Sequence, residues 1–288
     1  MSRSVARPSP GAASMYERHW QLRRPPFRSD VPAEFYFGGR TQQAALLKLR
    51  YLIEQRQGLG VVSGPAGAGK TYLLETFCEQ LARSCGPVVH VYFPQLTAAE
   101  LLGYVTAKLG DGNELAATDE PRLDVVLRQM EGHLTRLHQQ GRHPLLLIDD
   151  AHLIDDPRVW QTLLLLLNGG LADRARLSIV LCGPPELLGR LRRFGALEDR
   201  LELSCVLQSL DEAETAAYVH HRLHVAGGSP DLFDSTALAA VHQLSGGLPR
   251  RINRLCDFAL LVGYAENRPV ITRAEIDAVA DELTPLAA

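Results

Sequence analysis

A glycine-rich segment of eight residues is the part of the sequence with the clearest capacity for chemistry. It satisfies the pattern G-x-x-x-x-G-K-[ST], in which glycines let backbone N–H groups turn inward around phosphate oxygens. The lysine neutralises phosphate charge, and the hydroxyl after it is a ligand for Mg²⁺. The pattern predicts a binding loop for ATP and Mg²⁺ made of Gly64, Pro65, Ala66, Gly67, Ala68, Gly69, Lys70 and Thr71, followed by Tyr72.

A pair of acids supplies the second half of such a site. A phosphate loop needs a carboxylate at the end of another buried strand to hold the metal, and Asp149 follows four apolar residues, 145–148. Asp150 is then placed to orient or activate the attacking water. The alternative is that the two acids are only a polar strand end before a turn. We expect the nearby His152 to be structural or solvated rather than catalytic, as lone histidines usually are.

The elements around these residues alternate between short apolar runs and segments of helical periodicity. Such alternation is typical of a parallel sheet with crossover helices, which places the glycine-rich loop between a strand and a helix. The predicted strands are 59–63, 88–93, 145–149, 177–182 and 202–207. The predicted helices of this region are 41–57, 71–83, 157–167 and segments within 97–109 and 123–140.

The pattern becomes helical only after the last strand, which indicates a second, all-α domain. Its predicted helices are 211–225, 235–244, 249–264 and 273–282. The expected organisation is a disordered tail (1–14), an N-terminal linker wrapping the core (15–40), an α/β nucleotide-binding domain (41–208) and a helical domain (209–288).

Composition is that of a globular protein, with 46% hydrophobic and 22% charged residues among 288. The apolar runs are too short to span a membrane, and a net charge of −3 predicts no general affinity for nucleic acid. Five cysteines form no C-x-x-C pair, which argues against a disulfide framework and favours a cytoplasmic location. Only three residues are lysines, so the one in the phosphate pattern is notable: Lys48, Lys70 and Lys108.

The sequence Asp-Asp-Ala-His at 149–152 resembles the Asp-Glu-Ala-His/Gln box of the ExeA/GspA-type AAA+ ATPases, which are related to transposition and origin-recognition ATPases. Blocks at 15–22, 181–187 and 246–257 are also similar to that family. The resemblance implies an ASCE-type P-loop NTPase, with a three-layer α/β/α parallel sheet followed by a small all-α lid. It also implies a homo-oligomeric ring or filament that hydrolyses ATP at subunit interfaces.

The same resemblance assigns roles to two arginines. Arg250 matches the lid arginine called sensor 2, which reaches the γ-phosphate, although it could instead be a solvated helix-end cation. Arg200 matches an arginine that enters the site of a neighbouring subunit, with Arg192 and Arg193 as rivals. A surface salt bridge is the alternative for Arg200.

Two residues depart from the family pattern. Asp150 replaces the usual glutamate, which shortens the acid by one methylene, and Pro184 replaces a common glutamine. We therefore expect nucleotide binding with turnover that is slow. The residues expected to sandwich adenine, or alternatively to be plain core, are Phe27, Phe37 and Ile252.

Three hypotheses describe the cellular process that the ATPase serves. The first is the assembly or remodelling of a secretion or envelope machine through a protein partner. The second is a regulator on duplex DNA, favoured by the arginines at 190, 192 and 193 but opposed by the net charge of −3. The third is a nucleotide-dependent assembly switch with little hydrolysis.

Overall fold

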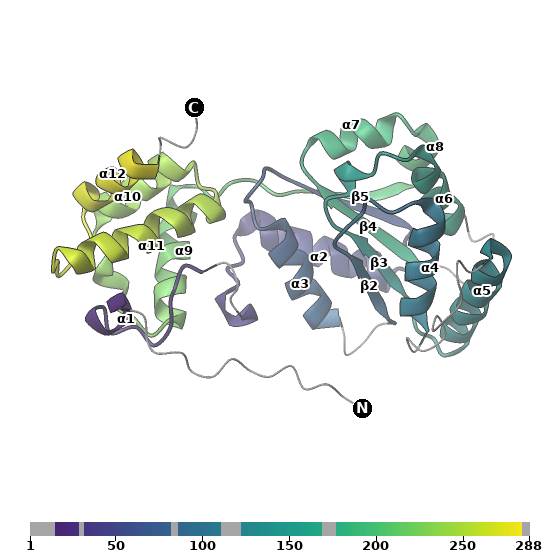
Figure 1. The fold of residues 1–288 in the computed structure, drawn as a ribbon, viewed down its shortest axis with the longest axis horizontal. Coiled ribbons are helices and arrows are strands. Elements are labelled where there is room, and N and C mark those ends of the chain that lie inside the picture. Colours follow the sequence, from purple (N-terminus) through teal and green to yellow (C-terminus); the bar gives the residue numbers. More distant parts are fainter. Residues whose placement is uncertain (1–14, 29–31, 82–85, 111–121, 169–176, 284–288) are drawn as a thin grey trace. The chain divides into compact units, whose positions relative to one another are not determined.

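The computed structural model describes residues 15–28, 32–81, 86–110, 122–168 and 177–283 (Figure 1). The chain divides into two compact units. One consists of Arg40–Gln208 and is called the α/β unit, and the other combines Met1–Gly39 with Ser209–Ala288 and is called the helical unit. The tail predicted at 1–14 lies outside the described residues.

The α/β unit contains a five-stranded parallel sheet in the order β2-β3-β4-β1-β5. Its strands are β1 Leu59–Ser63, β2 Val88–Val91, β3 Leu145–Ile148, β4 Ser178–Gly183 and β5 Leu201–Val206. The central strands are buried along their whole length, which explains their predominantly apolar sequences. Strand β4 separates β1 from β3, so groups at the ends of β1 and β3 face each other across one strand.

Helices cover both faces of this sheet, which confirms the predicted three-layer α/β/α fold (Figure 1). On one face α2 packs beside α3, and a Cβ atom at Gly60 of β1 would lie 2.8 Å from Leu52 of α2. On the other face the core joins sheet residues to α4, α5 and α6. These helices are α2 Arg40–Glu54, α3 Lys70–Leu81, α4 Ala98–Leu109, α5 Leu123–Gln139 and α6 Pro157–Leu167.

The structure differs from the predicted elements at two places. Strand β2 ends at Val91 rather than at residue 93, because Tyr92 and Phe93 are 58% and 65% exposed and leave the sheet. Two short helices between β4 and β5 are not among the predictions: α7 Glu186–Arg192 and α8 Gly195–Glu198. Short segments carry too little periodicity to be recognised as helices.

The helical unit is built from α9 Glu212–Val225, α10 Ser235–Ser245, α11 Pro249–Ala265 and α12 Arg273–Leu283. Two of its helices, α9 and α10, begin at side-chain caps. Asp211 accepts from the backbone of Glu214, whose side chain returns the bond, and Asp234 accepts from the backbone of Ala237. Gly246 ends α10 in the left-handed conformation, with φ of 62°.

The N-terminal segment packs against the helices of this unit. The Trp20 indole donates a hydrogen bond to the carbonyl oxygen of Leu260 at 2.9 Å, and the Tyr16 hydroxyl donates to Asp257 at 2.7 Å. The segment includes α1 Met15–His19 and the short helix η1 Ala33–Phe35. Its aromatic residues bury themselves here because the apolar faces of α9 and α11 supply their partners.

A buried arginine holds the second half of this segment. Arg222 of α9 is 2% exposed, and its guanidinium donates to the carbonyl oxygens of Pro26 and Arg28 at 2.5 and 2.6 Å. The same group lies over the ring of Phe35, 5.1 Å from its centroid. The buried cation is thus compensated by backbone dipoles and an aromatic face. None of the helices in the described ranges has the length and apolarity to cross a bilayer.

A buried histidine lies at the amino end of the sheet. His143 is 7% exposed, and its Nε2 lies 2.8 Å from Ser178 Oγ, which in turn donates to the carbonyl oxygen of Gln57. Burial, reinforced by the charge of Arg56, lowers the pKa of His143 from 6.5 to about 4. The folded chain therefore binds this proton less readily than the unfolded chain does.

This difference predicts a loss of stability in mild acid. Because the pKa of His143 is lower in the folded state, neutral His143 contributes its full stabilising free energy above about pH 6.5. This contribution is lost as the pH falls toward about 4. Between about pH 7 and pH 5, wild type should lose about 2 kcal/mol more unfolding free energy than His143→Gln, which keeps a donor but does not titrate. Urea unfolding at both pH values measures this. Equal losses would show that His143 does not drive the change.

Candidate functional site

The glycine-rich loop joins the carboxyl end of β1 to the first turn of α3. Gly67 and Gly69 have φ of 82° and 87°, a left-handed region that glycine adopts without strain. At Gly64 a Cβ atom would lie 2.8 Å from the carbonyl oxygen of Leu207, so only glycine fits there. These requirements explain why three glycines stand at these positions.

The ammonium group of Lys70 lies across this loop. Its Nζ donates to the carbonyl oxygens of Gly64 and Pro65 at 3.0 and 3.1 Å. Helix α3 begins at Lys70, so the unpaired N–H groups and the positive end of its dipole are in the same place. Cation, helix terminus and glycine backbone together form a cradle suited to a polyphosphate.

Asp149 reaches this cradle from the end of β3. Its carboxylate is 4% exposed and accepts from the Thr71 hydroxyl at 2.6 Å and from the backbone N–H of Asp150 at 2.9 Å. A hydroxyl and a carboxylate in contact are the hard oxygen ligands that Mg²⁺ prefers. The residues present therefore fit a magnesium ion, held by Thr71 and Asp149. The structure thus brings together the sequence-predicted residues of both motifs.

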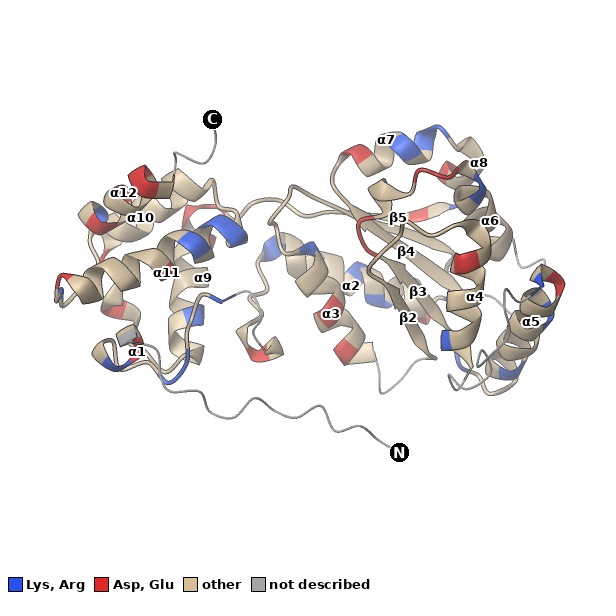
Figure 2. Ribbon diagram, viewed as in Figure 1, with Lys and Arg blue, Asp and Glu red and all other residues tan. Residues whose placement is uncertain are grey.

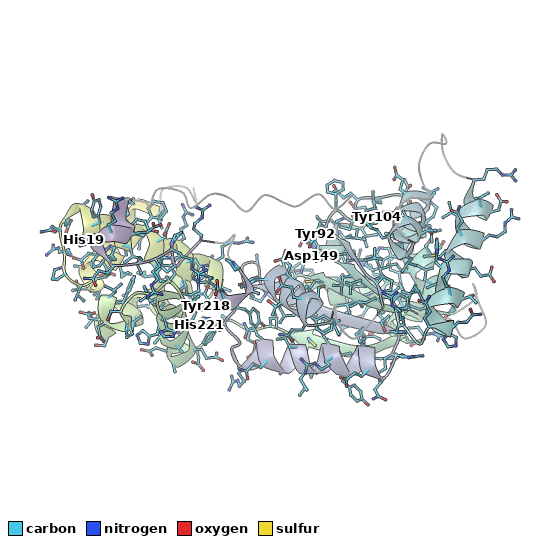
Figure 3. The ribbon with its side chains drawn as sticks, turned by 90° about the horizontal axis from the view of Figure 1, so that it is seen from below. His19, Tyr92, Tyr104, Asp149, Tyr218 and His221 are labelled. Atoms are coloured by element: carbon cyan, nitrogen blue, oxygen red, sulfur yellow. The ribbon has the colours of Figure 1, made fainter. Side chains whose placement is uncertain are left out.

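The negative charge of Asp149 contributes to raised pKa values of titratable groups around it. Burial, and then the nearby Asp149 carboxylate, raise the pKa of Glu75 on α3 and the pKa of the Cys182 thiol on β4. Burial also raises the pKa of Tyr92, which lies close to Asp149 in Figure 3, and acidic neighbours including Asp149 add to it. This region thus favours neutral side chains and added cations.

Sequence reasoning did not single out Glu75 or Cys182 as neighbours of the metal acid. A signal existed for each of them. Glu75 lies one helical turn after Thr71, and Cys182 is the second-last residue of the strand beside β3. Only the order of the strands in the sheet shows that these two positions lie near Asp149.

Asp150 occupies a sharp turn directly after β3. Its φ of 45° and ψ of 37° are left-handed, a conformation that aspartate tolerates better than most residues. The turn leads into the short helix η2 Ala151–Leu153, and the Asp150 side chain remains 56% exposed. The Asp150 carboxylate is therefore open to water, as its predicted role in orienting water requires.

Arg200 lies at the opposite edge of the sheet from the loop. It directly precedes β5, whose first residue Leu201 pairs with Leu59, whereas the loop begins after Ser63 at the other end of β1. Four residue steps along a strand separate these edges by about 13 Å. Arg200 is exposed, so its geometry suits contact with another molecule better than with its own loop.

Basic positions on α7 are blue in Figure 2. The rivals of Arg200, which are Arg192 and Arg193, and their neighbour Arg190 differ in their side-chain partners. Arg192 lies 3.6 Å from Glu198. Arg190 bonds to Asp155 and to the carbonyl oxygen of Ile154, both at 3.1 Å. For Arg193 the described residues provide no side-chain partner. These pairings reduce the free positive charge that α7 presents.

Four predicted site residues belong to the helical unit. Arg250 is exposed in the first turn of α11, directly after Pro249. Ile252 is fully buried in the core of this unit, and Phe27 is 3% exposed and packs edge-to-face on Phe233. Phe37 packs edge-to-face on Tyr218. Their proposed contacts with nucleotide therefore stay predictions, as does that of Tyr72 beside the loop.

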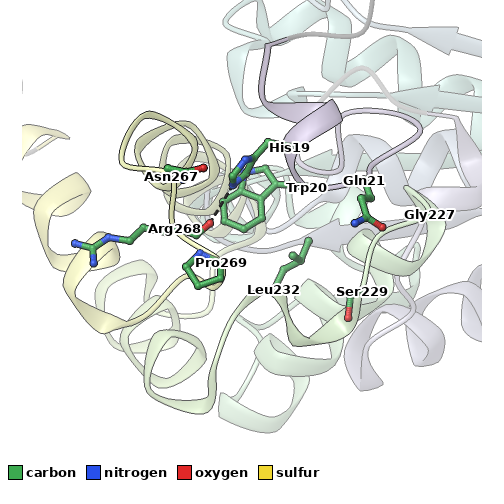
Figure 4. A pocket seen from close by; sticks show the side chains of 9 residues that line it. All are labelled: His19, Trp20, Gln21, Gly227, Ser229, Leu232, Asn267, Arg268 and Pro269. Atoms are coloured by element: carbon green, nitrogen blue, oxygen red, sulfur yellow. Dashed lines mark hydrogen bonds between the residues drawn. The ribbon is translucent and has the colours of Figure 1, made fainter.

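A cavity of about 480 Å³ lies within the helical unit, beside the N-terminal segment (Figure 4). Two of its polar residues have partners: His19 Nε2 lies 3.0 Å from the carbonyl oxygen of Arg268, and the Arg268 guanidinium pairs with Glu266 and Glu275 outside the lining. None of the predicted site residues lines this cavity. It does not belong to the phosphate site.

Comparison with known proteins agrees with this geometry. A family model described as an AAA domain matches residues 53–191, which contain both the glycine-rich loop and the acid pair. General secretion pathway protein A of Aeromonas hydrophila is 30% identical over 273 residues. The match covers 94% of this chain but 49% of that protein, so the chain spans about half the length of its relative.

Solved structures share the fold at lower identity. Drosophila ORC bound to DNA has a TM-score of 0.68 and 18% identity, covering 100% of this chain and 70% of that one. Cdc6p from Pyrobaculum aerophilum has a TM-score of 0.70 and 14% identity, covering 89% and 70%. At these identities the likeness establishes the fold alone. The chain is thus an AAA+ protein of the P-loop type, related along nearly its whole length to General secretion pathway protein A.

Proposed function

We propose that this chain binds ATP with Mg²⁺ and hydrolyses it. The observation that carries the proposal is the 2.6 Å contact between Thr71 Oγ1 and Asp149 Oδ2 beside the Lys70 ammonium. A hydroxyl and a carboxylate in contact beside a phosphate cradle support a site for Mg²⁺ there. The AAA domain match over the same residues supports it.

Each residue of the site has a separate role in the proposed reaction. Lys70 neutralises β- and γ-phosphate charge, while Thr71 and Asp149 hold the metal. Bound Mg²⁺ would supply further positive charge to the phosphates. Asp150, exposed on its left-handed turn, orients the attacking water. The shorter acid at this position favours slow turnover.

We further propose that the active form is a homo-oligomer. The position of Arg200 at the sheet edge away from its own loop supports a role in the site of a neighbouring subunit. In the same scheme Arg250 reports the phosphate state. Hydrolysis would then depend on assembly.

The process served is proposed from the relative. General secretion pathway protein A supports a role in the assembly or remodelling of a secretion or envelope machine. We place the chain in the cytoplasm, where ATP is supplied and where the free thiols of Cys78, Cys182, Cys205 and Cys256 stay reduced.

Lys70→Ala should weaken ATP binding by at least about tenfold, because a charge-assisted contact to phosphate is removed. Fluorescent ATP titration in the presence of Mg²⁺ measures the affinity. Lys48→Ala is the matched control, since Lys48 is exposed on α2 and should bind as wild type does. Unchanged binding by Lys70→Ala would refute the phosphate site.

Arg200→Ala should bind ATP normally but lose hydrolysis, because its partner site lies on another subunit. Mixing it with Asp150→Asn should restore some turnover, since mixed interfaces combine one intact Arg200 with one intact Asp150. The measurement is the hydrolysis rate across mixing ratios. Inactivity at every ratio would contradict a role between subunits.

The direct test of the proposal is steady-state ATP hydrolysis as a function of protein concentration, with Lys70→Ala as the blank. A rate per subunit that rises with concentration is expected if assembly completes the site. Duplex DNA is added in a parallel series, because stimulation by DNA would favour a DNA regulator over a secretion component. ATP binding without turnover above the blank would leave a nucleotide-dependent assembly switch.

A further inference from the structure

The imidazole of His152 lies close to the solvent-exposed carboxylate of Asp150. His152 lies in η2, two residues after Asp150, and its side chain is 30% exposed. Its Nδ1 atom is nevertheless buried and makes no hydrogen bond with any described residue. An unsatisfied buried ring nitrogen is unfavourable, so its neighbours are informative.

The space around this nitrogen is set by the end of β4. A Cβ atom at Gly183 would lie 3.1 Å from Leu187 of α7, which is tight, and 3.4 Å from His152 Nδ1, an ordinary van der Waals distance, so His152 Nδ1 lies directly beside Gly183. On the other side, Nδ1 lies 3.8 Å from Asp150 Oδ1. A shift of about 1 Å would convert this approach into a hydrogen bond.

We propose that His152 is a positioning residue for Asp150, a role that rests on the proposed ATP hydrolysis. The neutral imidazole with its hydrogen on Nδ1 donates to Asp150 Oδ1 when nucleotide is bound. The carboxylate keeps its negative charge, and its second oxygen remains free to accept from the attacking water. His152 itself touches neither the water nor the phosphate.

The exposed position of Asp150 explains why such a donor is needed. Its side chain is 56% exposed, and its own backbone N–H is already committed to Asp149. A short carboxylate in solvent samples several orientations, of which few direct an oxygen at water. A hydrogen-bond donor at His152 Nδ1 would select one of these orientations. Misplacement by about 1 Å is enough to cost about a hundredfold in rate.

Substitutions at 152 separate donation from packing. His152→Leu introduces an apolar side chain of similar size that cannot donate a hydrogen bond, whereas His152→Asn places an amide N–H near the position of Nδ1. His138→Leu on α5 is the control, because that histidine is exposed and lies outside the site. Steady-state hydrolysis gives kcat and KM, fluorescent ATP titration gives affinity, and thermal melting tests folding.

The expected result is a fall in kcat of about tenfold to a hundredfold for His152→Leu, with KM, ATP affinity and melting temperature as in wild type. His152→Asn should recover most of the loss, and His138→Leu should match wild type. Equal kcat in His152→Leu and wild type, or equal loss in the Leu and Asn variants, would overturn the positioning role alone. Wild-type turnover no higher than that of Lys70→Ala would overturn the proposed hydrolysis and this inference with it.

Discussion

The buried charge of Asp149 is the constraint on which the α/β unit depends. A carboxylate that is 4% exposed is costly unless donors and cations compensate it. The hydroxyl at the start of α3 and the backbone after β3 supply two donors, and these bonds fix the first turn of α3 against the end of β3. The strand order, with β4 between β1 and β3, sets the separation that this contact requires.

The two edges of the sheet consequently differ in character. The phosphate loop and the acid pair lie at the carboxyl edge. Their neighbours Glu75 and Cys182 have pKa values that burial and nearby negative charge raise. The amino edge carries Arg200 and the buried His143. A parallel sheet puts all strand ends of one kind together, so one molecule presents an acidic site on one edge and a candidate cation on the other. Such a division suits an assembly of identical subunits.

The phosphate loop, the acid pair and most elements could be predicted from sequence because their signals are local. Glycines at left-handed positions, apolar runs in buried strands and capping residues each act within a few positions of the chain. The loop at 64–71 and the helices of the second unit are examples. Fold class follows from their alternation, and the structure confirms it.

What could not be predicted depends on which distant segments meet. The aromatic residues at 16–37 indicated burial, but their sequence does not say whether the sheet or α11 would cover them. The buried guanidinium of Arg222 gave no periodic signal, since its partners are backbone carbonyls almost two hundred positions away. The position of His152 beside Gly183, the last residue of β4, likewise gave no local signal.

The helical unit is built from two separate segments of the chain, which affects when it can fold during synthesis. Its core needs Trp20 and Phe35 from before Arg40 and helices from after Gln208, with the whole α/β unit between them. At about 5–20 residues per second, the ribosome takes roughly ten to forty seconds to deliver the second part. During that interval the aromatic N-terminal segment has no helices of its own to cover it. The α/β unit, continuous in the chain, can form first, and the aromatic segment stays exposed until the helices after Gln208 have been synthesised.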